Sequence, residues 1–294
     1  MRLGTFRLSN ASFIGVLDGN DVIDLAAAAA ALPRYREAQT AFSDMRTTLA
    51  SVETIRGLLK EGPVLGPFKR PLDQLKIQAP IANPNKIICI GLNYLDHAIE
   101  SHAEVPTEPV IFTKFRTSIT GPGQPIRLPR ISKTVDYEAE LAVVIGKTGK
   151  RIPEEEAMEH VAAYTVFNDV SARDLQNRGS QWTKGKALDT FAPLGPYLVT
   201  RDEIADPHNL AIKLELNGKL MQNSSTSQLI FKIPQLISFL SELVTLEPGD
   251  LIATGTPPGV GMARKPPVFL QPGDTVKVSI AGLGELVNPV VADS

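Results

Sequence analysis

The chain has 294 residues, of which 43% are hydrophobic and 21% charged, and its formal net charge is -2. This composition is typical of a globular protein with one large domain or two. The near balance of charge offers no basic surface for a phosphate backbone, so we expect small-molecule or protein partners and no nucleic acid.

The cysteine content and the start of the chain bear on where the protein works. The single cysteine, Cys89 in KIICIG, cannot form an internal disulfide, and we expect a buried, inert thiol in a reducing compartment. The first ten residues, MRLGTFRLSN, show no secretory pattern, and the apolar run LAAAAAAL is far shorter than the ~20 residues of a membrane helix. We therefore expect a cytoplasmic protein without a membrane partner.

Residues 1–75 are predicted to form a small α+β domain. The segments RLGTFRL and SFIGVLDGNDVIDL alternate apolar and polar residues around a turn at Asp18, Gly19 and Asn20, which indicates a hairpin. The alanine-rich run and VETIRGLLKEG are typical of helices, the second ended by Gly62 and Pro63.

Residues 76–294 are predicted to form a larger, mainly β domain. Short β-type runs broken by Gly and Pro, among them IICIG, PVIFTKF, AYTVFNDV and DTVKVSIAGLG, favour a sandwich, barrel or rolled sheet. Two helices are expected, IPEEEAMEHVAA and IPQLISFLSELV, each with proline in its first turn. The predicted fold class is therefore α+β, mainly β.

The segment VDYEAELAVVIGK carries acids on a predicted strand. Since side chains alternate along a strand, Asp136, Glu138 and Glu140 are expected to share one face. A solvated edge strand is one reading, but LAVVIG continues the strand with apolar residues on both faces, as in a buried strand. Buried carboxylates need a compensating cation, and Mg²⁺ or Ca²⁺ binds carboxylate oxygens. Asp169, at the end of AYTVFND, is a third candidate acid.

Arg173 and Gln176 in SARDLQ are three residues apart and would share one face of a helical turn. Arg173 could bind a substrate carboxylate through two parallel hydrogen bonds. Alternatively, it pairs structurally with Asp169 or Asp174.

Two further segments carry polar candidates. Lys184 and Lys186 lie in GSQWTKGKALDTFAPLGP, where a lysine beside carboxylates could stabilise an enolate, although a solvated lysine is the commoner case. The strand and glycine-rich loop of PGDLIATGTPPGVG contain Thr254 and Thr256. This loop either lets backbone amides approach an anionic ligand or is a plain turn.

His97 and Glu100 in GLNYLDHAIES are predicted to lie on one face of a short helix, with Asn93 as a candidate N-cap. A glutamate that orients a histidine makes the imidazole a usable general base near neutral pH. A surface pair without function is the alternative.

Six motifs occur in a specific order: GLNYLDHAIE, DYEAELAVVIGK, NDVSARDLQ, WTKGKALDTFAPLGP, LNGKLMQ and PGDLIATGTPPGVG. Over about residues 85 to 290 the sequence resembles the fumarylacetoacetate hydrolase superfamily. The resemblance implies a mixed β-roll catalytic domain, preceded by a small α+β domain, and a homodimer. It also implies a bound Mg²⁺ or Mn²⁺ ion, with Ca²⁺ as an alternative occupant.

The resemblance assigns roles to individual residues. It implies that the metal is held by Glu138, Glu140 and Asp169, and leaves the role of Asp136 open. It implies a His-Glu dyad on a mobile lid at His97 and Glu100, an active-site lysine at Lys186 rather than Lys184, and substrate contacts at Arg173, Gln176 and Thr256.

The implied chemistry is that of a 2-oxo acid whose pyruvate enolate is stabilised by the metal and Lys186. Hydrolysis of acylpyruvates, with His97 and Glu100 activating water, is the first expectation. Oxaloacetate decarboxylation and 2-hydroxydienoate isomerisation or hydration on the same site are alternatives. A non-catalytic metal-containing binding protein is a further alternative, against which His97, Glu100 and Lys186 argue, since a structural metal needs neither a base nor a lysine.

Overall fold

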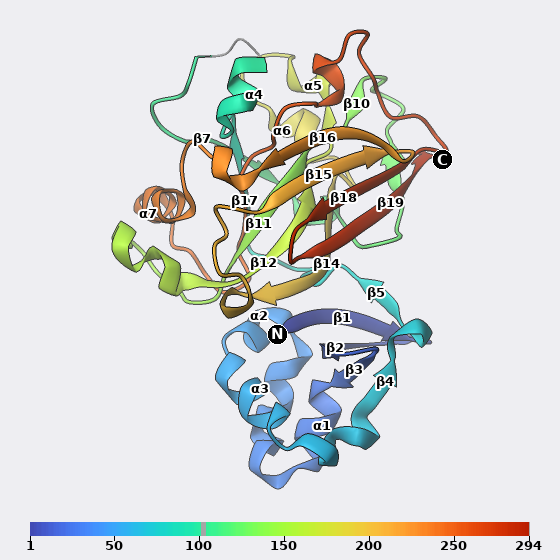
Figure 1. Cartoon of the computed structure of the whole chain (residues 1–294), viewed down its shortest axis with the longest axis vertical. Helices are drawn as coiled ribbons and strands as arrows, with labels where there is room; N and C mark the ends of the chain where they lie inside the picture. The colour runs from blue at the N-terminus through green and yellow to red at the C-terminus, as the bar shows by residue number, and fades with distance from the viewer. Residues whose placement is uncertain (101–103, 294) are drawn as a thin grey trace.

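The computed structural model describes residues 1–100 and 104–293. Its N-terminal part, blue in Figure 1, combines an antiparallel sheet with helices that cover one face. The elements of this part are β1 (Arg2–Leu8), β2 (Ala11–Asp18), β3 (Asp21–Asp24), α1 (Leu25–Ala31), η1 (Pro33–Ser43), α2 (Met45–Leu49), α3 (Val52–Leu59), η2 (Gly62–Phe68), β4 (Lys69–Pro71), η3 (Leu72–Gln74) and β5 (Lys76–Gln78), where η denotes a 3-10 helix.

The turn and both helices predicted for this part are present. Asp24 caps α1 by accepting the N–H of Ala27 at 3.0 Å. Helix α3 ends at Leu59, shortly before Gly62, which adopts a left-handed φ of +60°. Gly19, with a φ of +61°, lies in the turn between β2 and β3. The predicted hairpin extends to three antiparallel strands, because β1 also pairs with β2.

The larger part is built mainly of strands. Its strands are β6 (Ile87–Gly91), β7 (Val110–Lys114), β8 (Ile119–Thr120), β9 (Ile126–Leu128), β10 (Val135–Asp136), β11 (Ala139–Ile145), β12 (Val161–Asn168), β13 (Ser171–Ala172), β14 (Ala192–Thr200), β15 (Ala211–Leu216), β16 (Lys219–Ser225), β17 (Leu251–Ala253), β18 (Thr275–Ile280) and β19 (Gly284–Ala292). Its helices are α4 (Leu95–Glu100), η4 (Arg116–Ser118), η5 (Glu154–His160), α5 (Arg173–Gln176), α6 (Thr183–Lys186), η6 (Arg201–Glu203), η7 (Thr226–Gln228), α7 (Ile233–Leu243) and η8 (Gly261–Ala263).

One sheet runs through both parts, in the order β4-β3-β2-β1-β14-β12-β11-β17-β6-β7, with β5 paired to β1 and β8 to β14. Strand β1 lies antiparallel to β14, with Leu3 opposite Leu198. Side chains from both parts, among them Leu25 and Val144, pack in one hydrophobic cluster. The predicted boundary between residues 75 and 76 thus falls inside a continuous sheet, directly before β5.

A second sheet, in the order β16-β15-β18-β19-β9, packs on β11 and β12. In Figure 1, β15, β16, β18 and β19 lie in front of β11 and β12. Leu141 and Val143 of β11 share a core with Leu214 and Val278 of the second sheet. Strand β11 is buried along its whole length, as predicted for LAVVIG. The chain is α+β and mainly β, which confirms the predicted fold class.

The two helices predicted for the larger part differ in outcome. The segment IPQLISFLSELV forms α7, with proline in its first turn. The segment IPEEEAMEHVAA forms only the 3-10 helix η5, and its last residues begin strand β12. The prediction of a long helix there was wrong because Val161, opposite Ile145, pairs with β11, and this tertiary pairing overrides local helix propensity.

Cys89 is fully buried in β6. Burial, followed by the charge of nearby Asp169, raises the pKa of its thiol, so the thiol stays protonated and unreactive, as expected. In the part of the chain that the structure describes, no helix combines the length and hydrophobicity needed to cross a membrane.

Candidate active site

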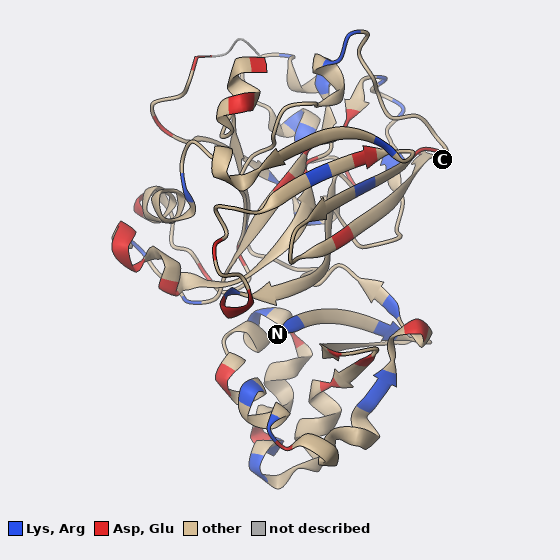
Figure 2. Cartoon of the chain, in the orientation of Figure 1, with Lys and Arg blue, Asp and Glu red and all other residues tan. Residues whose placement is uncertain are grey.

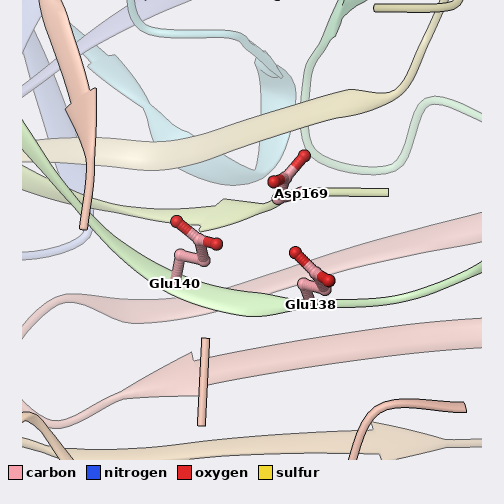
Figure 3. A group of neighbouring side chains, drawn as sticks. All are labelled: Glu138, Glu140 and Asp169. Carbon is pink, nitrogen blue, oxygen red and sulfur yellow. The ribbon is translucent and has the colours of Figure 1, made fainter. Parts of the chain in front are cut away.

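Three acids meet where the start of β11 lies beside the end of β12 (Figure 3). Glu138 directly precedes β11, Glu140 is its second residue, and Asp169 directly follows β12. One carboxylate oxygen of each acid lies within 4.8 Å of the others, and all three residues are buried. The backbone N–H of Asp169 donates to the carbonyl oxygen of Glu138 at 2.8 Å, which joins the two strand ends. The predicted trio is therefore assembled by one antiparallel strand pair.

This carboxylate group fits a divalent cation. Burial, followed by the charges of Asp169 and Glu138, raises the pKa of Glu140 well above its usual range, and a bound cation removes that cost. Asp169 Oδ1 is buried and, apart from the Lys114 ammonium 2.7 Å away, has no polar partner among the described residues, so a lone pair remains for an ion. A set of carboxylate oxygens suits hard cations such as Mg²⁺ and Mn²⁺.

Lys114, the last residue of β7, was not singled out in the sequence. Its ammonium lies 2.7 Å from Asp169 Oδ1 and donates to the carbonyl oxygens of Val170, Lys186 and Phe191. The contact with Asp169 is thus a buried ion pair at hydrogen-bonding distance. Because burial outweighs the attraction of Asp169, the pKa of Lys114 is lowered. The lysine joins three backbone segments behind the carboxylate group.

Lys186, at the end of α6, lies beside the carboxylates. Its ammonium donates to Glu138 Oε2 at 2.7 Å and to Asp169 Oδ2 at 2.8 Å, and lies 4.9 Å from the centre of the Phe112 ring. Burial disfavours the charged form of the ammonium, but the negative charges of Asp169 and Glu138 outweigh this effect and raise the pKa of Lys186. Lys184 is exposed, so the structure brings Lys186, and not Lys184, to the carboxylate group.

Arg173 pairs with neither Asp169 nor Asp174, the partners that the sequence suggested for a structural role. Its Nε donates to Asp136 Oδ1 and its Nη2 to Glu138 Oε1, both at 2.6 Å. Its Nη1 donates to Oε1 of Gln176 at 3.0 Å, on the same turn of α5, as the spacing predicted. Burial opposes the guanidinium charge, but Asp136 and Glu138 prevail and raise its pKa.

Asp136 takes a role that the sequence left open. It was expected to share a face with Glu138 and Glu140, but the regular strand is interrupted between β10 and β11. One oxygen of Asp136 accepts Arg173 Nε, and the other accepts the N–H of Met262 at 2.8 Å. Asp136 therefore orients the arginine and fastens the segment around η8, and it is not one of the three clustered acids.

Thr256 lies in the loop after β17, where its Oγ1 accepts a hydrogen bond from Gln222 Nε2 at 2.9 Å. Gln222, in β16, also donates to the carbonyl oxygen of Pro257 and accepts the N–H of Ala139 at 2.8 Å. It thereby ties the threonine loop to the carboxylate strand. Its motif, LNGKLMQ, was noted in the sequence, but the role of the glutamine was missed.

The His-Glu pair lies on α4. His97 Nδ1 is 3.1 Å from Glu100 Oε2, and the same carboxylate accepts the N–H of Gly259 at 2.9 Å and 3.1 Å. Although burial opposes ionisation, the hydrogen bonds from His97 and Gly259 lower the pKa of Glu100. His97 lines the same cavity as Glu138 and Glu140, which places the imidazole near the carboxylate group.

Asn93 does not act as the predicted N-cap. Its side-chain nitrogen donates to the carbonyl oxygens of Phe231 and Thr254, and its side-chain oxygen accepts the N–H of Phe231 at 2.7 Å. On α4 itself, Asp96 Oδ2 accepts the hydroxyl of Ser224 at 2.5 Å. These contacts fasten the helix that carries His97 against the second sheet and the loop after β17.

A cavity of about 370 Å³ joins these groups. All the predicted site residues except Asp169 line it, namely His97, Glu100, Glu138, Glu140, Arg173, Gln176, Lys186 and Thr256. Asp169 lies behind this lining, linked to it through Lys186. Phe112, Trp182 and Met262 supply apolar walls that sequence analysis did not foresee. The cavity therefore offers carboxylates that fit a metal ion, two buried cations and a histidine to one small molecule.

Comparison with known proteins identifies the family. The family model described as fumarylacetoacetate (FAA) hydrolase C-terminal matches residues 86–291. A protein of Xenopus laevis named "Oxaloacetate tautomerase fahd2, mitochondrial" is 50% identical over 299 residues, which is 99% of this chain and 90% of that protein. The human protein named "Oxaloacetate tautomerase FAHD2A, mitochondrial" is 48% identical over 297 residues, 99% of this chain and 92% of that protein.

Among solved structures, maleylpyruvate hydrolase from Sphingobium sp. SYK-6, in complex with manganese (II) ion and pyruvate, superposes with a TM-score of 0.81. It is 33% identical, and the match covers 100% of both chains. A neighbour of the same fold has thus been crystallised with a divalent metal, in keeping with the carboxylate group described above.

The expected cytoplasmic location is contradicted by these relatives, because the Xenopus laevis, Bos taurus and human proteins are named mitochondrial. A lone buried cysteine is compatible with any reducing compartment, so it could not distinguish one from another. Together, the matched family model and the full-length relatives show that this chain is an enzyme of the fumarylacetoacetate hydrolase family.

Proposed function

We propose that the protein interconverts the keto and enol forms of a 2-oxo dicarboxylic acid of the oxaloacetate type. The observation that supports this most is the convergence of the carboxylate group, Lys186 and the His97–Glu100 pair on one cavity. Relatives about half identical over nearly the whole chain are named oxaloacetate tautomerase. Hydrolysis of acylpyruvates, the first expectation from the sequence, becomes the second candidate and is favoured by the maleylpyruvate hydrolase structure.

We further propose that Glu138, Glu140 and Asp169 hold Mg²⁺ or Mn²⁺. When bound there, a divalent cation supplies Lewis-acid stabilisation of negative charge that develops on a substrate oxygen. The residues around it carry the remaining steps. Lys186, kept protonated by its two carboxylate partners, adds a fixed positive charge next to the same oxygen.

Substrate orientation is assigned to Arg173, Gln176 and Thr256. Arg173 uses one N–H each for Asp136, Glu138 and Gln176, and a guanidinium carries five, so donors remain for a substrate carboxylate. Its position is fixed by Asp136 before substrate arrives, which lowers the entropy lost on binding.

Proton movement is assigned to His97. Glu100 holds Nδ1, and His97 takes the proton from the carbon beside the keto group and passes it to the enolate oxygen, and the reverse transfer restores the keto form. The net reaction moves one proton from carbon to oxygen and consumes no water. Hydrolysis on the same site would require His97 to deprotonate water instead.

The proposal is tested with purified protein and Mg²⁺ or Mn²⁺. We expect accelerated decay of the ultraviolet absorbance of enol-oxaloacetate, with oxaloacetate recovered intact by mass spectrometry, because only a proton moves. Acylpyruvates serve as the parallel panel, in which release of pyruvate and an acid would assign hydrolysis. Oxaloacetate converted to pyruvate and carbon dioxide would assign decarboxylation. Enol decay at the uncatalysed rate, with metal demonstrably bound, would falsify the proposal.

We also propose that the protein is a homodimer, as the family resemblance implied. Exposed apolar side chains border a groove between β7 and α7, namely Ile111, Phe115, Leu243 and Val244. Their burial against a second copy would remove apolar area from water, which stabilises the dimer by about 25 cal/mol per Å².

We expect light scattering to give twice the 31.8 kDa of one chain, and Phe115→Asp to shift the mass toward one chain. A 31.8 kDa particle at micromolar concentration contradicts the proposal.

A further inference from the structure

The cations that line the cavity differ in how their charge is used. Arg173 is ion-paired with Asp136 and Glu138, and Lys186 with Glu138 and Asp169. Lys265 also lines the cavity, but it is exposed and makes no ion pair within residues 1–100 and 104–293. Its charge is therefore available to a ligand, whereas much of the charge of the inner cations is already offset.

Lys265 lies on a segment whose backbone is fastened. The N–H of Met262 donates to Asp136, and the N–H of Val268 donates to the carbonyl oxygen of Gly261 at 2.9 Å. Figure 2 shows basic residues on the segment that follows η8. Since the backbone is held by hydrogen bonds on both sides of Lys265, the position of its Cα is restrained.

Arg264, the neighbouring cation, is used differently. Its guanidinium donates to the backbone carbonyl oxygens of Gly259 and Met221, and it does not line the cavity. Val260, Met262 and Ala263, which precede Lys265 on the same segment, are the apolar members of the cavity lining there. On this segment Lys265 is therefore the charge that faces the cavity, and an ammonium there favours a ligand with an anionic end.

We propose that Lys265 binds a second carboxylate of the substrate and makes the site selective for 2-oxo dicarboxylic acids. The inference rests on the proposed function. The 2-oxo acid end of the substrate occupies the inner part of the cavity, beside Glu138, Glu140 and Lys186, so its far end points outward. A carboxylate there meets Lys265, and charge complementarity at such a site favours the dicarboxylate over its neutral analogue.

The test compares oxaloacetate with its 4-methyl ester, which lacks the second charge. In Lys265→Ala we expect the KM for oxaloacetate to rise about three- to tenfold with kcat nearly unchanged, the scale of a partly exposed charge-assisted contact. The KM for the ester should not change, and Lys265→Arg should restore the KM for oxaloacetate. Lys184→Ala, which removes an exposed lysine outside the cavity lining, is the matched control.

An equal rise in KM for both substrates, or no rise for either, overturns the inference and leaves Lys265 a solvated lysine. The proposed function is judged separately, by wild-type turnover. If wild-type protein binds oxaloacetate without converting it, the proposed function fails, and titration calorimetry of oxaloacetate against wild type and Lys265→Ala still decides the role of Lys265. Absence of any oxaloacetate binding to wild type overturns both.

Discussion

Replacing Glu138 with alanine is expected to abolish divalent-metal binding and to lower turnover on the order of 10³-fold or more. Glu138 supplies one of three clustered carboxylates and also accepts hydrogen bonds from Lys186 and Arg173. Its removal therefore takes a ligand from the metal group and an anion from both cations. The measurements are calorimetric titration with Mn²⁺ and the rate of enol-oxaloacetate decay.

The control for this substitution is Glu155→Ala, which removes an exposed acid on η5, away from the cavity. It should leave Mn²⁺ binding and turnover unchanged. Circular dichroism of Glu138→Ala should retain the wild-type spectrum, so that loss of activity is not loss of fold. Wild-type affinity for Mn²⁺ in Glu138→Ala would contradict the assignment of the metal group.

Replacing Lys186 with methionine is expected to separate catalysis from metal binding. The substitution removes a positive charge that lies 2.7 Å from Glu138 and 2.8 Å from Asp169. We expect kcat to fall about 10²- to 10³-fold, because a fixed charge next to the developing enolate oxygen is lost. Affinity for Mn²⁺ should stay the same or increase, since a competing cation has left the carboxylate group.

Lys184→Met is the matched control, because Lys184 is exposed and lies two residues away on α6. It should keep both kcat and Mn²⁺ affinity. Thermal unfolding should be compared in the presence of Mn²⁺, which replaces the missing partner of the carboxylates. Loss of Mn²⁺ binding in a folded Lys186→Met protein would show that the lysine holds the site together, and would overturn its assignment to catalysis.

The carboxylate group could be predicted in part from the sequence, because the shared side of Glu138 and Glu140 depends on local periodicity, whereas their role as metal ligands was implied by the family resemblance. Glu138 and Glu140 are two residues apart, and side chains two apart lie on one side of a strand. Asp169 directly follows the next strand, β12. To bring it to the two glutamates, the chain also needs the antiparallel pairing that places Asn168 opposite Ala139. The apolar run after Glu140 indicated that this strand is buried, and it is.

Other parts of the site could not be predicted, because they depend on contacts between segments far apart in the chain. Lys114 meets carbonyl oxygens 56 to 77 residues away, and Gln222 reaches Ala139 over 83 residues. Asn93 is a residue type favoured at helix N-caps, yet its side chain forms a hydrogen bond with Phe231, 138 residues away. Propensity describes what a segment prefers in isolation and does not name its partners.

The sequence by itself determined the β-rich fold class, the family, and which acids, lysine and histidine are available for chemistry, because strand alternation and ordered motifs are local properties of the chain. Only the tertiary structure decided that Asp136 holds Arg173 rather than a metal, that Gln222 ties the Thr256 loop to the carboxylate strand, and that Lys265 lines the cavity. These outcomes follow from the approach of distant backbone segments, which sets the partners of each buried charge.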